Sequence, residues 1–238
     1  MRIIRVEHGG TSYYGILEDG LVFRLHQQPG HMEPILLSEA KVLPLVTPSK
    51  VVCVGLNYKA HAEELGYPLP NMPSFFLKPP SSIIGNGEPI VLPSGMGRIE
   101  HEAELAMVVG KVCRNLTPEE AEESLFGFTC ANDVTAREVQ KVDPLIGHCK
   151  SYDTFCPIGP WIETELEDIN DLSIRCLVNG EVRQSANTED MIFRPLDLLC
   201  FLSRVMTLMP GDVILTGTPP GISPIQADDV VQVSIEGI

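Results

Sequence analysis

Three carboxylates in the middle of the chain have a spacing that could form a metal site. Glu102 and Glu104 stand at the start of the apolar run 105–109, and Asp133 follows the apolar run 128–131. Residues i and i+2 of a strand project from one face, so the two glutamates are expected to lie side by side. Carboxylates so placed repel each other unless one is protonated or a cation neutralises them. Three oxygen ligands suit Mg²⁺, Mn²⁺ or Ca²⁺ better than zinc. A solvated acidic strand edge is the alternative.

A second group with catalytic potential lies upstream of the carboxylates. Residues 57–65 are helix-forming and place His61 and Glu64 at positions i and i+3, which are neighbours on one helical face. Gly66 and the prolines after it end the helix. A short helix inside a Gly/Pro-rich loop is typical of a lid over an active site. On these residues alone, an incidental pair on a surface helix is the alternative.

Six sequence blocks, in this order along the chain, together resemble the fumarylacetoacetate hydrolase family. They are GLNYKAHAEE at 55–64, KPPSS at 78–82, E-x-E at 102–104, NDVTAR at 132–137, KSYD at 150–153 and TGTP at 216–219. The resemblance covers Val51 to Ile235, and six blocks in register are far more specific than any one of them. It implies the family's mixed β-sandwich roll, a bound Mg²⁺ or Mn²⁺ ion and a small anionic 2-oxo acid as substrate.

The resemblance also implies roles for individual residues. The metal ligands would be the three carboxylates, Glu102, Glu104 and Asp133. His61 and Glu64 would form a dyad that orients and deprotonates a water molecule, and the ammonium group of Lys150 would face substrate oxygens. The implied substrate contacts are Arg137, Gln140 and Thr218. His101 and His148 flank these motifs, but we interpret them as outer or surface groups because a hard oxygen site does not need imidazole.

Three functions from different classes fit this set of residues. The first is metal-dependent cleavage of a C–C bond in a 2-oxo or 1,3-diketo acid, as in an acylpyruvate hydrolase or an oxaloacetate decarboxylase. The second is an isomerase or tautomerase of a 2-hydroxy-dienedioate or of oxaloacetate, in which only a proton moves. The third is metal and ligand binding without catalysis, because a fold does not dictate function. The dyad favours the first, although the same base could also move a proton.

Composition limits which binding partners and which cellular compartment are expected. The chain has 238 residues, a net charge of −15, 44% hydrophobic residues and 21% charged residues, as in an ordinary soluble protein. No basic stripe exists to neutralise phosphates, so nucleic acid and anionic membranes are not expected partners. Seven scattered cysteines without a C-x-x-C pair indicate free thiols in a reducing cytoplasm and no zinc site. The family resemblance also implies a homodimer.

The elements that must position these residues are mostly strands. Residues 1–45 alternate apolar and polar residues around two glycine turns and predict a small N-terminal β lobe, followed by a catalytic domain at 46–238. Further strands are predicted at 51–54, 75–77, 90–92, 128–131, 213–216 and 230–235, with an Asn-Gly hairpin at 172–184. Besides the helix at 57–65, helices are expected from Thr117 to near Gly127 and from Asp197 to Met209. Two or three helices among many strands indicate a strand-rich α+β fold rather than a Rossmann domain.

Overall fold

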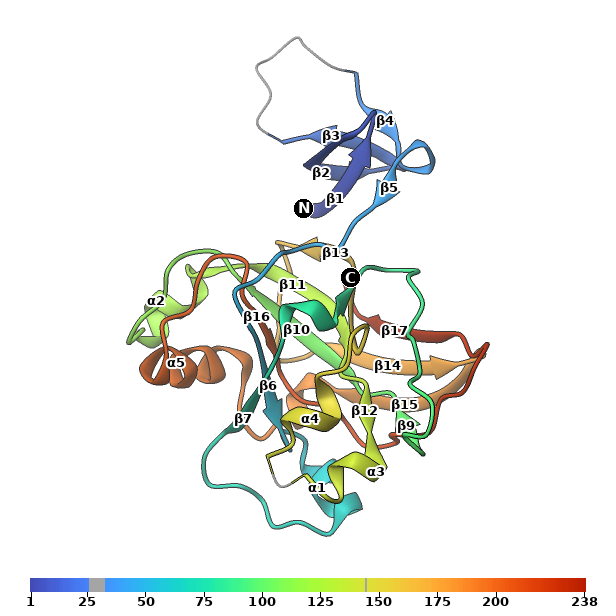
Figure 1. Ribbon diagram of the computed structural model, residues 1–238. Coiled ribbons are helices and arrows are strands. Elements are labelled where there is room, and N and C mark those ends of the chain that lie inside the picture. Colours follow the sequence, from blue (N-terminus) through green and yellow to red (C-terminus); the bar gives the residue numbers. More distant parts are fainter. Residues whose placement is uncertain (26–32, 144) are drawn as a thin grey trace.

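A computed structural model describes residues 1–25, 33–143 and 145–238 of the chain (Figure 1). The strands in this part are β1 Arg2–His8, β2 Thr11–Glu18, β3 Leu21–Arg24, β4 Ile35–Leu36, β5 Lys41–Val42, β6 Val51–Gly55, β7 Ser74–Lys78, β8 Ile83–Ile84, β9 Ile99–Glu100, β10 Ala103–Val109, β11 Leu125–Asn132, β12 Thr135–Ala136, β13 Cys156–Glu163, β14 Ser173–Val178, β15 Glu181–Asn187, β16 Val213–Leu215 and β17 Val231–Ile235. The helices are α1 Lys59–Leu65, α2 Pro118–Glu122, α3 Arg137–Gln140, α4 Gly147–Lys150 and α5 Pro195–Val205. This strand-rich α+β fold confirms the predicted class, with five short helices in place of two or three.

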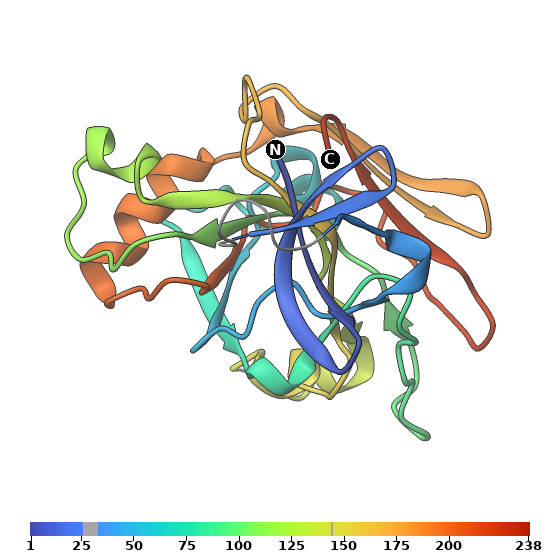
Figure 2. The same cartoon turned by 90° about the horizontal axis from the view of Figure 1, so that it is seen from above.

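One large mixed sheet forms the frame of the molecule. Its strands follow the order β4-β3-β2-β1-β13-β11-β10-β16-β6-β7, with β5 paired to β1 and β8 to β13. β6 runs parallel to β16 and antiparallel to β7, so it is a central strand, and Val51 to Val54 are buried. The N-terminal strands join this sheet through the pairing of β1 with β13. Seen from above, they cross over the body (Figure 2).

β10 divides the interior into two apolar cores. Ala103, Leu105 and Met107 face a core that the small sheet β15-β14-β17 and helix α5 close. Ala106 and Val108 face the core beneath the N-terminal strands. Because side chains alternate along a strand, a residue of β10 faces one core or the other, and Glu104 shares its face with Ala106. A charged group on this strand is therefore buried wherever it points.

The cysteines agree with the prediction of free thiols. All seven cysteines are buried and free of disulfides. Burial raises the pKa of several of their thiols, to about 12 for Cys156, so these thiols remain protonated at neutral pH. Among helices of the described ranges, none is long and apolar enough to cross a membrane.

The boundaries of α2 and α5 differ from the prediction. The capping box of Thr117 and Glu120 and the proline at the first helical position are present, but α2 ends at Glu122 and β11 begins at Leu125. The helix was predicted to continue to near Gly127, but Leu125 and Gly127 belong to β11 and pair with β10. Pairing in the sheet therefore outweighs helix propensity in this segment. α5 begins at Pro195 and ends at Val205, before the apolar positions that had extended the predicted helix.

The predicted strand at Ile90–Leu92 is wrong. This segment belongs to a long connection between β8 and β9 with glycine turns at Gly95 and Gly97. The Val91 N–H donates to the Thr154 hydroxyl at 2.8 Å and not to a neighbouring strand. A segment of β-forming residues becomes a strand only where a neighbouring strand pairs with it. By contrast, the Asn-Gly hairpin is confirmed, with both turn residues at positive φ.

Candidate active site

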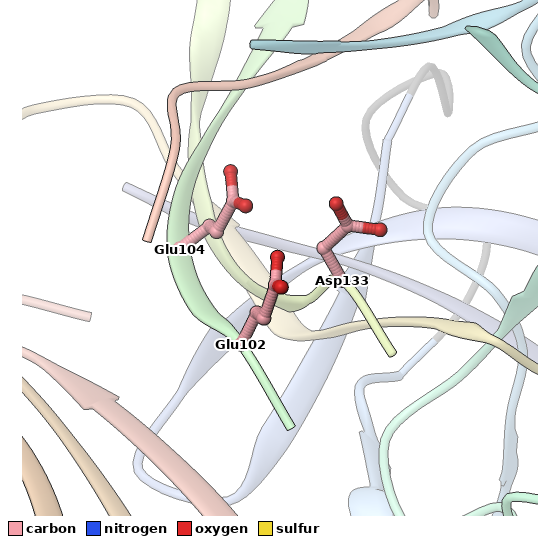
Figure 3. Close-up of side chains that lie close together, drawn as sticks. All are labelled: Glu102, Glu104 and Asp133. Carbon is pink, nitrogen blue, oxygen red and sulfur yellow. The ribbon is translucent and has the colours of Figure 1, made fainter. Parts of the chain in front are cut away.

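The three predicted carboxylates converge in the folded chain. One oxygen from each of Glu102, Glu104 and Asp133 lies within 4.8 Å of the others, and we call this group the carboxylate triad (Figure 3). Glu102 is 5% exposed and Glu104 and Asp133 are each 1% exposed, so a solvated strand edge is excluded. Three unscreened carboxylates at this distance require positive charge nearby.

Strand pairing places the triad. Ala103 of β10 lies opposite Asn132 of β11, so the residue before one strand and the residue after the other meet. The Asp133 N–H donates to the Glu102 carbonyl at 2.8 Å, and the Glu102 N–H donates to the Asn132 side chain at 2.9 Å. Backbone and side-chain hydrogen bonds thus hold the two ligand-bearing positions on rigid strand ends, which is the support that a metal site needs.

Buried cations hold two of the three carboxylates. Lys150 Nζ bridges them, at 2.6 Å from Glu102 Oε2 and 2.7 Å from Asp133 Oδ2. Lys78 Nζ donates to Asp133 Oδ1, and Arg137 Nη2 donates to Glu102 Oε1. The three cationic side chains are no more than 9% exposed. Each oxygen of Glu102 and Asp133 therefore contacts a cation, and each keeps lone pairs for a second partner.

The pKa values of the two glutamates shift in opposite directions. Burial alone would raise the pKa of Glu102, but Lys150 and Arg137 outweigh burial and lower it. Burial raises the pKa of Glu104 well above its usual range, and repulsion from Asp133 and Glu102 adds to this rise. Glu104 is the member of the triad that forms no ion pair with a cation of the described residues, although Lys150 is close enough to offset part of this rise.

Glu104 also shows whether the triad fits a metal ion. Its Oε2 accepts the N–H of Gly217 at 2.5 Å, and within the described residues no hydrogen bond reaches its Oε1. An unpaired carboxylate oxygen beside two like charges favours a divalent cation, and a donor set of carboxylates alone suits Mg²⁺ or Mn²⁺. His101 does not join the set, because its Nδ1 lies 3.0 Å from Gln184 Oε1 and its Nε2 lies 2.8 Å from the Ser223 hydroxyl. The residues present therefore fit a hard divalent ion.

Metal binding is expected to release a proton. The folded-state pKa of Glu104 is raised, so this group keeps its proton at pH values where a glutamate of the unfolded chain is ionised. The metal-free protein therefore loses stability as the pH rises from the usual glutamate pKa toward the raised value. Within that window, Mn²⁺ affinity should rise with pH and binding should release up to about one proton. Calorimetric titration in buffers of different ionisation enthalpy measures this release. Heats that do not depend on the buffer, with a pH-independent affinity, would contradict it.

The His61 and Glu64 pair is formed on α1. His61 Nδ1 and Glu64 Oε2 lie 2.8 Å apart, and His61 is 5% exposed. Glu64 Oε1 accepts the N–H of Gly221 at 3.0 Å. Gly221 ends the turn Thr216–Gly221, hereafter the Thr218 turn, which also donates to Glu104. One turn thus connects the dyad to the triad.

The three implied substrate contacts all have protein partners, and Gln140 is linked to the triad only through Arg137. Arg137 Nε donates to Glu100 Oε2 at 2.6 Å, and its Nη1 donates to Gln140 Oε1 at 2.8 Å. The Thr218 hydroxyl donates to the Ala103 carbonyl at 2.9 Å. That proton is consequently not free for a substrate carboxylate unless the bond to Ala103 breaks.

Three buried residues of the site had no predicted role. Lys78 stands in the KPPSS block, Glu100 pairs with Arg137, and Gln184 belongs to the far strand of the Asn-Gly hairpin. A lysine that ends a strand with an apolar face was the available signal for Lys78. Nothing local marks Gln184, because its partners come from another sheet.

Comparisons with known proteins identify the family of the chain. Residues 50–238 match the family model described as Fumarylacetoacetate (FAA) hydrolase C-terminal, and residues 1–43 match the model Rv2993c-like, N-terminal. The chain is 45% identical over 185 residues to the mitochondrial oxaloacetate tautomerase FAHD2A of Homo sapiens, covering 75% of this chain and 58% of that protein.

Two solved structures share the whole fold. The 5-carboxymethyl-2-hydroxymuconate delta-isomerase of Mycobacterium smegmatis is 41% identical, with a TM-score of 0.92 over 100% of this chain and 95% of that one. The maleylpyruvate hydrolase of Sphingobium sp. SYK-6, in complex with manganese(II) ion and pyruvate, is 31% identical, with a TM-score of 0.83 over 99% of this chain and 95% of that one. With more than three quarters of its length matching the family model, the chain belongs to the fumarylacetoacetate hydrolase family.

Proposed function

We propose that the protein is a divalent-metal-dependent isomerase or tautomerase of a small 2-oxo dicarboxylic acid. The observation that carries this proposal is the buried triad, in which Glu104 forms no ion pair with any described residue while Lys150 lies against the other two carboxylates. Mg²⁺ or Mn²⁺ held there by Glu102, Glu104 and Asp133 would polarise the keto oxygen of the substrate as a Lewis acid. The site then concentrates positive charge where an enolate develops.

The dyad would supply the base. Its geometry commits His61 Nδ1 to Glu64 and leaves Nε2 as the ring nitrogen available to take a proton. In keto–enol interconversion, His61 would remove a proton from the carbon beside the keto group, and the protonated imidazole would then return this proton to the enolate oxygen, which restores His61. Glu64 orients the ring and stabilises the charge that His61 gains.

Lys150 would face the developing oxyanion. Burial alone would lower its pKa, but Asp133 and Glu102 outweigh burial and raise it, so the group stays an ammonium ion at neutral pH. Its Nζ also lies 5.2 Å from the centre of the Phe76 ring. An ammonium ion held between carboxylates and an aromatic face is fixed in place before the substrate arrives, as electrostatic stabilisation of a transition state requires.

Relatives favour proton transfer over bond cleavage. The oxaloacetate tautomerases of Xenopus laevis and Homo sapiens are 41% and 45% identical to this chain. The M. smegmatis structure is that of an isomerase. All of these reactions move a proton next to a carbonyl group, which the triad, Lys150 and the dyad are equipped to do.

Cleavage of a C–C bond is the second candidate, and the dyad is the observation that favours it. A buried histidine oriented by a carboxylate can deprotonate a water that attacks the distal carbonyl of an acylpyruvate. The Sphingobium hydrolase supports this alternative. Oxaloacetate decarboxylation needs no such water, so the two cleavage reactions should depend differently on His61.

Replacing His61 by Ala separates these functions. If His61 is the base, enzymatic oxaloacetate keto–enol interconversion should fall by about 10²- to 10⁴-fold, the usual range for general acid–base catalysis. Glu63→Ala, on the same helix but outside the dyad, is the matched control and should retain activity. Initial rates with Mg²⁺ on oxaloacetate, acetylpyruvate and a 2-hydroxy-dienedioate measure the effect. If the variant loses acetylpyruvate cleavage but keeps keto–enol interconversion, the hydrolase function is favoured. If the parent protein is inactive on all three substrates, only metal and ligand binding without catalysis remains.

A further inference from the structure

The edge of β10 next to the triad is completed by side chains and not by a strand. β16 pairs with β10 from Ala106 to Val108 and then turns away at Thr216. Farther along that edge, the Ala103 N–H donates to Gln184 Oε1 at 3.0 Å, and the Ala103 carbonyl accepts the Thr218 hydroxyl at 2.9 Å. Both backbone groups of the residue between Glu102 and Glu104 are thus satisfied from outside the ladder.

Gln184 is the residue that spans this gap. It projects from β15 of the small sheet and is fully buried. Its Oε1 contacts Ala103 N and His101 Nδ1, and its Nε2 donates to Thr218 Oγ1 at 2.8 Å and to the Pro219 carbonyl at 2.7 Å. All four hydrogen-bonding positions of the amide are used, two on each side of the gap.

Backbone groups determine which way the amide points. The Ala103 N–H can only donate and the Pro219 carbonyl can only accept, so oxygen faces β10 and nitrogen faces the Thr218 turn. The Thr218 oxygen therefore accepts a hydrogen bond from Gln184 Nε2, and its own O–H donates to the Ala103 carbonyl. Gln184, Thr218 and Ala103 are thus joined by hydrogen bonds whose directions depend on one another. None of these bonds can exchange its donor and acceptor without a change in the others.

We propose that Gln184 is a positioning residue that fixes the Thr218 turn against the end of β10 that carries Glu102 and Glu104. The turn donates Gly217 N–H to Glu104 and Gly221 N–H to Glu64, so its placement sets groups in both the triad and the dyad. A slip of the turn would move these donors together. The consequence for catalysis rests on the proposed function, whereas the positioning itself does not.

Amide hydrogen exchange of Gln184→Met tests the positioning without metal or substrate. Methionine keeps the length of the side chain but makes none of the four hydrogen bonds. Exchange should become at least about tenfold faster in peptides covering both 101–104 and 216–221, because each segment loses its link to the other. The matched control is Ser203→Ala on α5, which removes buried bonds to Leu116 N and the Cys200 carbonyl away from the site. It should leave both segments unchanged.

Thr218→Val is the second variant, and it removes both bonds of the Thr218 hydroxyl, from Gln184 Nε2 and to the Ala103 carbonyl. The Ala103 N–H keeps its bond to Gln184, so exchange should rise in 216–221 and not in 101–104. Unchanged exchange in both segments of Gln184→Met, or an equal rise in Ser203→Ala, would overturn the proposal. If Gln184→Met does not fold, an unchanged 216–221 segment in Thr218→Val would overturn it.

Mn²⁺ affinity adds a readout that a purely structural role would not move. Gln184→Met should bind Mn²⁺ about tenfold more weakly than the parent, in the range seen when groups behind metal ligands are removed. Ser203→Ala should stay within about twofold of the parent. A parent without Mn²⁺ affinity would contradict the proposed function, while the exchange result would still decide the role of Gln184.

Discussion

Replacing Glu104 by Gln should weaken Mn²⁺ binding by at least about a hundredfold and abolish turnover. Replacing a residue that hydrogen-bonds to a metal ligand already lowers metal affinity by about 10- to 100-fold, and Glu104 would be a ligand itself. It is also the triad member whose Oε1 has no partner among the described residues, so its replacement removes the oxygen most available to an ion. Titration calorimetry with Mn²⁺ measures the loss.

A matched control distinguishes coordination from a general change of charge. Glu138→Gln removes one negative charge from the exposed end of α3, where Glu138 pairs with Lys141. This variant should bind Mn²⁺ as the parent does. Equal affinity of Glu104→Gln and the parent would show that the triad does not hold the ion.

Replacing Lys78 by Met should destabilise the metal-free protein by about 3–5 kcal/mol, the usual cost of removing one partner of a buried ion pair. Lys78 is 1% exposed and donates to Asp133, and the variant would leave that carboxylate with Lys150 alone. A divalent ion should restore part of the stability, because it supplies positive charge at the same carboxylates. Urea unfolding in EDTA and in Mn²⁺ measures both effects.

The stabilisation by Mn²⁺ is the discriminating part of that experiment. It should be larger in Lys78→Met than in the parent, since the variant has the greater excess of negative charge. Lys141→Met, which removes an exposed partner of Glu138, should leave the unfolding midpoint unchanged in both conditions. A Lys78→Met variant as stable as the parent in EDTA would contradict the ion-pair account.

The parts of the site that could be predicted from the sequence depend on short-range geometry. Glu102 and Glu104 share a face because side chains alternate along a strand, and His61 meets Glu64 because positions i and i+3 of a helix are neighbours. The capping box at Thr117 is equally local. Its helix nevertheless ended early, because pairing with β10 overrode helix propensity beyond Glu122.

The parts that could not be predicted depend on contacts between distant segments. Lys78 reaches Asp133 across 55 residues, and Gln184 reaches Ala103 across 81. No periodicity in the sequence around Lys78 or Gln184 indicates which distant residues they contact. The orientation of the Thr218 hydroxyl likewise follows from Gln184, so the chemistry of a residue in a matched motif was set by one outside it.

Proton NMR in D₂O measures the central claim most directly, by following the protons beside the keto group of oxaloacetate. With Mg²⁺, the parent should exchange these protons for deuterium at least about a hundredfold faster than buffer with Mg²⁺, as a positioned base and a polarised carbonyl require. EDTA-treated parent and Glu104→Gln should both exchange at the uncatalysed rate. Exchange no faster than in buffer, or equally fast after EDTA treatment, would contradict a metal-dependent proton transfer at this site.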